Sequence, residues 1–317
     1  MGGRYFSDKI VEWYIANRRN LPWRETNDPY RIWLSEIILQ QTRVSQGLPY
    51  YNKFLEKFPD VGTLARATEE EVLRLWQGLG YYTRARNLRQ CAISVTNNLK
   101  GIFPDCYESL RKLPGIGDYT AAAIASFAFE KPVAVVDGNV FRVLSRVFGI
   151  DKDINSTAGK KHFIQLANDL IDQRRPGLHN QAIMEFGALN CTPGRPLCEN
   201  CIFEKTCVAK TKGIQEELPV KEQVKAARKP HFYYFVIRHG NKIALKRREE
   251  KDIWKGLYDF CLVEKNRPAD PQKVWRENPF YESDPVFISP LYRHILTHQV
   301  ILARFIVIDS KKKTTQM

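Results

Sequence analysis

Two carboxylic acids differ in their expected surroundings. Glu36 lies in a largely apolar helix, where loss of water should raise its pKa, unless it faces a polar stripe of that helix. Asp137 precedes a helix expected to begin near Asn139, so it can cap that helix, and hydrogen bonds and the helix dipole would keep it ionised. One protonated acid beside one ionised partner is the pair that cleavage of a glycosidic bond requires.

Four of the seven cysteines crowd together in the spacing C-x6-C-x2-C-x5-C; they are Cys191, Cys198, Cys201 and Cys207. Because the chain opens without a secretion signal, metal ligation is favoured over disulfides or unligated thiols. Four thiolates can hold zinc or a [4Fe–4S] cluster, and the spacing leaves both open. The loop also carries Arg195, a cation that such a site could hold near phosphate.

A glycine-containing turn lies between the helical runs 108–113 and 120–126. Gly115 and Gly117, spaced by one residue, allow a tight turn whose backbone N–H groups point outward. The positive end of the following helix dipole would add to this, which indicates a phosphate grip that reads no base sequence. An ordinary turn between two helices is the alternative.

The elements that must position these residues are mostly helices. Residues 1–207 show helical periodicity, for example from Tyr30 to Val44 and at Val140, Val143, Leu144 and Val147. We therefore predict an all-α domain over residues 1–210. The composition changes from residue 208 onward, where Lys, Glu and Gln become common. This composition predicts a linker over residues 211–229. Residues 230–317 predict a smaller α+β domain, with strand-like runs at 232–237, 243–245, 258–263 and 300–308.

Length and charge bound the class of protein. A chain of 317 residues suits two domains, and no apolar run is long enough to cross a membrane. We expect a cytoplasmic monomer without a targeting signal. The net charge of +14 favours a polyanionic partner such as nucleic acid, although a solubilising surface would give the same surplus.

Several motifs together resemble a known superfamily. The segments L-P-G-I-G-D-Y-T (113–120) and V-V-D-G-N-V-F-R-V (135–143) and the cysteine loop resemble the endonuclease III superfamily of helix–hairpin–helix DNA glycosylases. Segments 21–24, 33–42 and 76–88 look like its adenine glycosylase branch, the MutY family. The resemblance covers nearly all of residues 5–207. It implies a mainly α protein: a two-part helix–hairpin–helix domain with a [4Fe–4S] loop, then a smaller Nudix-like α+β domain.

The resemblance also implies catalytic roles. Glu36 matches the general acid that protonates N7 of a flipped adenine, and Asp137 matches the carboxylate that stabilises the oxocarbenium-like sugar or bonds to it transiently. Asn139 would support Asp137 and the water. Tyr119 stands where bifunctional relatives place a Schiff-base lysine, and tyrosine cannot form an imine. A monofunctional glycosylase that leaves an abasic site is therefore expected.

Further positions match residues that contact the DNA bases. Trp23, Arg24 and Gln181 match the adenine pocket, although Trp23 could be core and the family varies between Gln and Glu at Gln181. Four others match residues that embrace the oxidised guanine left in the duplex: Gln41, Thr42, Leu79 and Tyr81. Leu79 or Tyr81 would wedge into the stack, with core packing as the alternative, above all for Leu79.

The C-terminal domain resembles the Nudix-like lesion-recognition domain of the same branch. Leu296-Thr297-His298 stands where the family has a Phe-Ser-His-type loop, so Thr297 and His298 could hydrogen-bond the oxidised guanine without an aromatic beside them. A loop or strand edge is the alternative. The Nudix hydrolase box is missing, which argues against a nucleotide hydrolase. The chain also ends early for this family, so a final strand and helix are expected to be missing.

The predicted activity is removal of adenine mispaired with 8-oxoguanine or guanine in double-stranded DNA. One alternative within the superfamily is a thymine/uracil mismatch glycosylase or an endonuclease III-type lyase. Another, of a different class, is a non-catalytic iron–sulfur DNA-binding protein. The pairing of Glu36 with Asp137 argues against the last, and Tyr119 argues against the lyase.

Overall fold

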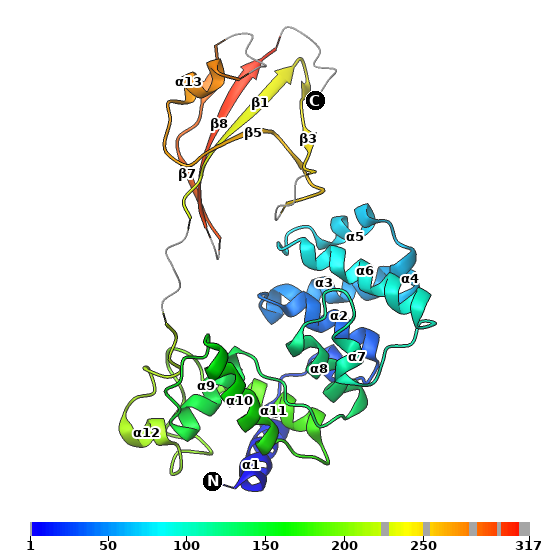
Figure 1. Cartoon of the computed structure of the whole chain (residues 1–317), viewed down its shortest axis with the longest axis vertical. Helices are drawn as coiled ribbons and strands as arrows, with labels where there is room; N and C mark the ends of the chain where they lie inside the picture. Colours follow the sequence, from blue (N-terminus) through cyan, green and yellow to red (C-terminus); the bar gives the residue numbers. More distant parts are fainter. Residues whose placement is uncertain (1, 223–227, 250–253, 279–283, 297–298, 311–317) are drawn as a thin grey trace. The chain divides into compact units, whose positions relative to one another are not determined.

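A computed structural model describes residues 2–222, 228–249, 254–278, 284–296 and 299–310. The chain divides into two compact units, Met1–Glu222 and Gln223–Met317, and each is described by itself (Figure 1). Within the described residues, no helix combines the length and apolar character that a membrane crossing needs.

The first unit is helical throughout its described elements. These are α1 (Gly3–Asn17), the short 3-10 helix η1 (Pro22–Arg24), α2 (Pro29–Leu39), α3 (Val44–Lys57), α4 (Val61–Arg66), α5 (Glu69–Trp76), α6 (Thr83–Asn98), α7 (Tyr107–Leu110), α8 (Asp118–Phe129), α9 (Gly138–Phe148), α10 (Thr157–Leu170), α11 (Pro176–Leu189) and α12 (Val208–Lys212).

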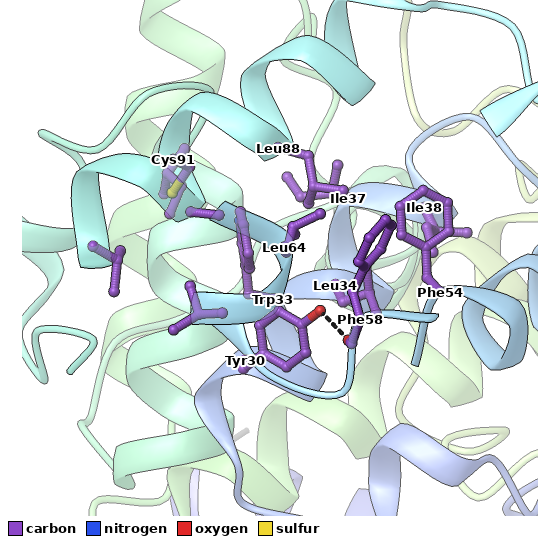
Figure 2. Packing of buried hydrophobic residues seen from close by; sticks show 14 of the residues in the cluster. Tyr30, Trp33, Leu34, Ile37, Ile38, Phe54, Phe58, Leu64, Leu88 and Cys91 are labelled. Carbon is purple, nitrogen blue, oxygen red and sulfur yellow. Dashed lines mark hydrogen bonds between the residues drawn. The ribbon is translucent and has the colours of Figure 1, made fainter. Parts of the chain in front are cut away.

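One of its two main cores surrounds α2. The helix is apolar on most sides and is covered by α3, α6 and α8. Figure 2 shows Trp33, Leu34 and Ile38 packed among side chains of the neighbouring helices, with the Tyr30 hydroxyl donating to the Phe58 carbonyl at 2.6 Å. Each such buried side chain stabilises the fold by about 1.5–3 kcal/mol.

The other main core joins α1 to the chain from residue 134 onward. Helix α11 packs against α1, α9 and α8. It therefore connects this core to α8, the helix that follows the glycine-containing turn of the hairpin. The ring of Phe6 on α1 stacks on that of Phe203 at 5.0 Å, and Phe186 meets Phe203 edge-on. The N-terminal helix therefore closes a core made mostly by residues far along the chain.

Two predicted helix ends were wrong. The helix expected from Tyr30 to Val44 ends at Leu39, and α3 begins at Val44 after a turn in which Gln41 has a left-handed backbone, φ +55°. The run before the hairpin ends at Leu110 rather than at residue 113. The first helix was predicted too long because its apolar pattern continues beyond Leu39, where the backbone already turns.

The segment after the cysteines packs on the first unit over part of its length. Val208–Lys212 forms α12, and Leu218 is 3% exposed in the core that α1 closes. The division between compact units falls after Glu222. Residues 223–227 lie outside the described part of the chain.

The second unit is built on a mixed sheet of order β2-β1-β8-β6. Strand β5 pairs with β1, β7 pairs with β8, and β1 runs parallel to β8. The strands are β1 (His231–His239), β2 (Lys242–Ile243), β3 (Lys246–Arg247), β4 (Tyr258–Asp259), β5 (Cys261–Lys265), β6 (Phe287–Ile288), β7 (Tyr292–Ile295) and β8 (Val300–Asp309). Helix α13 (Pro271–Arg276) places the fully buried Trp275 against Phe235 of β1. A mainly helical first part followed by a mixed β-sheet part is the predicted fold class.

Candidate active site

A cavity of about 200 Å³ gathers polar side chains from both main cores of the first unit. Residues of η1 and α2 line one part of it, and residues from α8, the start of α9 and α11 line the rest. The lining includes Trp23, Arg24, Glu36, Thr42, Tyr119, Asp137, Asn139, Gln181 and Glu185. Residues that are distant in sequence therefore face one space large enough for a small organic group.

Glu36 is a buried carboxyl group of this cavity whose pKa is raised. It lies in α2, which starts at the Asp28 N-cap, and is 8% exposed. Burial raises its pKa to about 7 and the nearby charge of Asp137 adds to this, while a hydrogen bond from Tyr119 and the charge of Arg24 oppose it. A large fraction of Glu36 is therefore protonated near neutral pH, so the group can give a proton to a ligand.

Asp137 caps α9, as predicted. Its Oδ1 accepts hydrogen bonds from the backbone N–H groups of Asn139 at 2.9 Å and Val140 at 2.8 Å. Its pKa is nevertheless raised, because burial outweighs these hydrogen bonds and the charge of Arg142. The hydrogen bonds of the cap favour the ionised form, as expected, but the cap lies inside a cavity and not at an exposed helix end, so burial acts against them.

Tyr119 and Asn139 hold the two carboxylates. The hydroxyl of Tyr119 donates to Glu36, and burial together with the charges of Glu36 and Asp137 raises the pKa of Tyr119 well above its usual value, so the phenol stays neutral. Asn139 donates from Nδ2 to Asp137 Oδ2 at 2.7 Å. Arg142 donates to the Asn139 amide oxygen at 2.8 Å, which fixes the orientation of that amide.

A buried ion cluster beside the carboxylates was missed from the sequence. Glu185 of α11 is 1% exposed and accepts paired hydrogen bonds from Arg19 and from Arg24, at 2.6 to 2.8 Å. Burial would raise the pKa of Glu185, but these arginines hold it at about 2. A lone glutamate in the apolar stretch 182–187 was the signal that could have found it.

Gln181 and Trp23 complete the wall. The amide oxygen of Gln181 accepts from the Tyr14 hydroxyl at 2.7 Å, so the amide nitrogen can serve a ligand. Trp23 lines the cavity and also meets Tyr51 edge-on at 5.2 Å, with 8% of its surface exposed. Trp23 therefore packs in the core and also lines the cavity, and its contact with adenine stays a prediction.

The residues matched to lesion contacts lie in two turns of the first unit. Gln41 and Thr42 follow α2, and Leu79 and Tyr81 follow α5. Gln41 and Tyr81 have left-handed backbones with φ of +55° and +50°, which costs about 1–3 kcal/mol per residue and is typical of functional turns. Leu79 is 7% exposed and packs in the core around α2, while Tyr81 is 41% exposed.

The hairpin presents its two glycines to solvent. Leu113 and Ile116 are buried and anchor the turn, whereas Gly115 and Gly117 are exposed. Gly115 has φ +74°, and a Cβ there would lie 2.6 Å from the Cβ of Asn87. Gly117 caps the twelve-residue α8, so an exposed helix start follows a turn that requires glycine.

The four clustered cysteines are free thiols close to one another. The pKa of Cys201 is raised to about 11 by burial, with the charges of Cys191, Cys207 and Cys198 adding to it. Arg146 donates to the Thr192 and Pro193 carbonyls, which shapes the loop after the first cysteine, and Arg195 is exposed on that loop. Across the described residues no acidic, His or Cys side chains form a group closed enough to hold a metal ion. The donor chemistry nonetheless suits a thiolate-bound centre.

Two predicted site residues lie outside the described part of the chain. They are Thr297 and His298. Their neighbours are described: Leu296 donates its backbone N–H to the Gln299 carbonyl at 2.8 Å, between strands β7 and β8.

Comparison with known proteins relates this site to DNA repair. Residues 34–168 match the model of the HhH-GPD superfamily base excision DNA repair protein. The chain is 36% identical over 256 residues to the adenine DNA glycosylase of Buchnera aphidicola subsp. Acyrthosiphon pisum, covering 80% of this chain and 73% of the relative. It is 46% identical over 213 residues to that of Mus musculus, covering 64% of this chain and 41% of the longer mouse protein.

Solved structures share the helical fold. A thermostable thymine-DNA glycosylase superposes with a TM-score of 0.62 at 32% identity, covering 66% of this chain and 97% of that one. An endonuclease III bound non-covalently to DNA superposes with a TM-score of 0.57 at 20% identity, covering 67% and 96%. The second likeness concerns the fold.

Proposed function

Since this chain belongs to the adenine DNA glycosylase (MutY) family within the HhH-GPD superfamily, we propose that it excises adenine mispaired with 8-oxoguanine or guanine in double-stranded DNA. The observation that carries the proposal is that Glu36, with its pKa raised to about 7, faces the same cavity as the capped carboxylate Asp137. A proton donor and a counter-ion on one cavity are what the departure of a purine requires.

The reaction begins when the adenine rotates out of the duplex into the cavity. Glu36 gives its proton to N7 of the base, which makes adenine a better leaving group. The bond between N9 and C1′ breaks and its electron pair leaves with the base. Asp137 offsets the positive charge that grows on the sugar. A water oxygen then bonds to C1′, its proton passes to a carboxylate, and an abasic site remains.

The surrounding polar groups support these two residues. Tyr119, a neutral phenol hydrogen-bonded to Glu36, orients the acid, and Asn139 holds Asp137 and the attacking water. Gln181 offers its amide nitrogen to the flipped adenine, and Trp23 and Arg24 close the pocket around it. Because position 119 carries a phenol, no Schiff base forms and the enzyme acts without a lyase step.

Contacts outside the cavity hold the duplex. Gly115 and Gly117 would grip a phosphate through backbone N–H groups, and Arg195 would approach another. The residues assigned to the oxidised guanine are Gln41, Thr42, Leu79, Tyr81, Thr297 and His298. The surplus of positive charge supports a DNA partner.

A [4Fe–4S] cluster is proposed on Cys191, Cys198, Cys201 and Cys207. The free thiols lie near one another, and the loop between the first two is shaped by Arg146. The cluster would act as a scaffold that holds this loop and Arg195 against the DNA. No step of the excision passes through it.

The test is a single-turnover excision assay on Glu36→Gln. The amide keeps the size of the acid and cannot give a proton, so excision should fall by a factor of about 10²–10⁴ while binding to lesion-containing duplex remains. Glu12→Gln on the exposed face of α1 is the matched control and should keep full activity. Full excision by Glu36→Gln would sink the assignment.

A thymine-DNA glycosylase activity is the second candidate, favoured by the 32% identity to a solved thymine-DNA glycosylase. Duplexes carrying adenine opposite 8-oxoguanine, adenine opposite guanine, and thymine opposite guanine separate the two, with heat and alkali added after the reaction. Borohydride trapping on abasic DNA would reveal an imine between enzyme and sugar. Because Tyr119 carries a phenol and no amine, we expect no trapped complex.

A further inference from the structure

One arginine of α6 joins the two turns that carry the residues assigned to the oxidised guanine. From Nη1, Arg84 donates to the carbonyls of Ile37 at 3.0 Å, Ile38 at 3.2 Å and Gln40 at 2.5 Å. From Nη2 it donates at 3.3 Å to the carbonyls of Leu79 and Gly80. A single guanidinium therefore bonds the end of α2 and the turn after α5.

The surroundings of Arg84 match this task. Its guanidinium lies 5.1 Å from the ring centre of Trp76 and 5.5 Å from that of Tyr81. Within the described part of the chain, all five hydrogen bonds of Arg84 go to backbone carbonyls, and its buried Nε has no acceptor there. The carbonyls at the end of α2 are the negative pole of that helix, which compensates the buried cation.

Both turns are strained where Arg84 holds them. Gln41 follows the bonded Gln40 with φ +55°, and Tyr81 follows the bonded Gly80 with φ +50°. Such backbones persist when the surroundings over-determine them. Trp76 adds a bond of 2.9 Å from its indole N–H to the Gly80 carbonyl.

From these contacts we infer that Arg84 is a positioning residue that makes the turns 40–42 and 78–81 one rigid unit for recognition of the base opposite adenine. The functional half of this inference rests on the proposed function. Its structural half, that the turns move together, stands on the contacts of Arg84 and does not depend on the activity. Arg84 lies outside the residues that line the cavity, so it acts through Gln41, Thr42, Leu79 and Tyr81.

The first experiment is backbone hydrogen exchange on the intact chain with Arg84→Lys. Lysine keeps the charge but lacks the planar guanidinium that reaches both turns, so amide exchange should rise by about tenfold in residues 40–42 and also in residues 78–81. The matched control is Arg89→Lys on the same helix, because Arg89 bonds one distant carbonyl, that of Ala67, at 2.6 Å. Faster exchange in one turn and not in the other overturns the coupling.

A second variant tests the coupling with Arg84 in place. Gly80→Ala adds a methyl group with nothing within 4 Å, at a φ of +70° that alanine resists. Its strain should pass through Arg84 and raise exchange at residues 40–42. Gly101→Ala is the matched control, since Gly101 also has a positive φ and open space but lies after α6. Unchanged exchange at 40–42 in Gly80→Ala overturns the inference, even if Arg84→Lys fails to fold.

The functional readout is the ratio of single-turnover rates on duplexes with adenine opposite 8-oxoguanine and opposite guanine. In Arg84→Lys this ratio should fall by about tenfold through slower excision from the 8-oxoguanine duplex, with the rate of excision from the guanine duplex nearly unchanged. Equal losses on both duplexes overturn the role in recognition. If the wild-type chain excises adenine from neither duplex, the proposed function has failed, and the exchange experiments still decide whether the turns are coupled.

Discussion

At the scale of single residues, Glu36 and Asp137 are both carboxyl groups facing one cavity, yet their hydrogen bonds differ. Asp137 accepts two backbone N–H groups and the Asn139 amide, all of which favour its ionised form. Glu36 accepts a hydrogen bond from Tyr119 and is otherwise governed by burial, so its pKa reaches about 7. These different surroundings assign the role of acid to Glu36 and that of counter-ion to Asp137, although both residues carry the same carboxyl group.

The sequence predicted Glu36, Asp137, Tyr119 and Asn139 as a group, and the structure brings them to one cavity. It did not predict Glu185, because its two arginine partners lie more than 150 positions away and no local pattern reports such a contact. The raised pKa of Asp137 was missed for the same reason. A cap can be recognised in a sequence, but the burial of that cap depends on helices from elsewhere in the chain.

The buried acid should leave a mark on stability. The pKa of Glu36 is raised above its unfolded value, so stability is fully present below about pH 4.5 and is lost as pH rises through about 7. Glu36→Gln removes this loss and should raise the free energy of unfolding at pH 8 by about 3 kcal/mol more than at pH 4.5. Thermal melts of both proteins across this range test it. A difference in melting temperature that stays constant with pH would contradict the raised pKa.

At the scale of elements, helices carry most of the residues of the site, and the sequence predicted these helices better than it predicted their ends. The apolar pattern predicted that α2 exists but placed its end five residues too late, at Val44 and not at Leu39. At the observed end, Arg84 of α6 donates to the carbonyls of Ile37, Ile38 and Gln40, a contact between distant residues that no local pattern reports. Strand-like runs of the second unit were found because they are short and rich in aromatic and β-branched residues, as in β1, but of the run 243–245 only Ile243 lies in a strand.

The hairpin offers a matched pair of substitutions. Gly115→Ala forces a Cβ at φ +74° to within 2.6 Å of Asn87, so the free energy of unfolding should fall by about 2 kcal/mol. Gly117→Ala meets nothing within 4 Å, so the melting temperature should hold, but its methyl group would keep a phosphate from the backbone. Affinity for undamaged duplex should then fall by about threefold to tenfold, measured by fluorescence anisotropy. Undiminished affinity in Gly117→Ala would argue against the phosphate grip.

At the scale of the whole molecule, composition predicted two parts and a polyanionic partner. The division after Glu222 is a property of packing: Leu218 is buried in the first unit although Glu216 and Glu217 precede it. No pattern in residues 208–222 identifies Leu218 as core. The net charge of +14 follows from the composition of the entire chain, so it can be calculated without knowing the fold.

That charge should govern the affinity for DNA. Phosphate contacts release counter-ions, so the logarithm of the association constant should fall with the logarithm of salt concentration at a slope of about −4 or steeper, about 0.9 per contact. Titrations of an undamaged duplex between about 50 and 300 mM salt measure this slope. A slope near zero would mean that the positive surface does not meet the DNA.

The central claim is that a protonated Glu36 gives its proton to the base while Asp137 is ionised. The measurement that tests it most directly is the pH dependence of single-turnover adenine excision from a duplex with 8-oxoguanine opposite adenine. The rate should fall about tenfold per pH unit above about pH 7, as Glu36 loses its proton, and should fall again in acid as Asp137 gains one. A rate that stays level or rises from pH 7 to 9 would contradict the account.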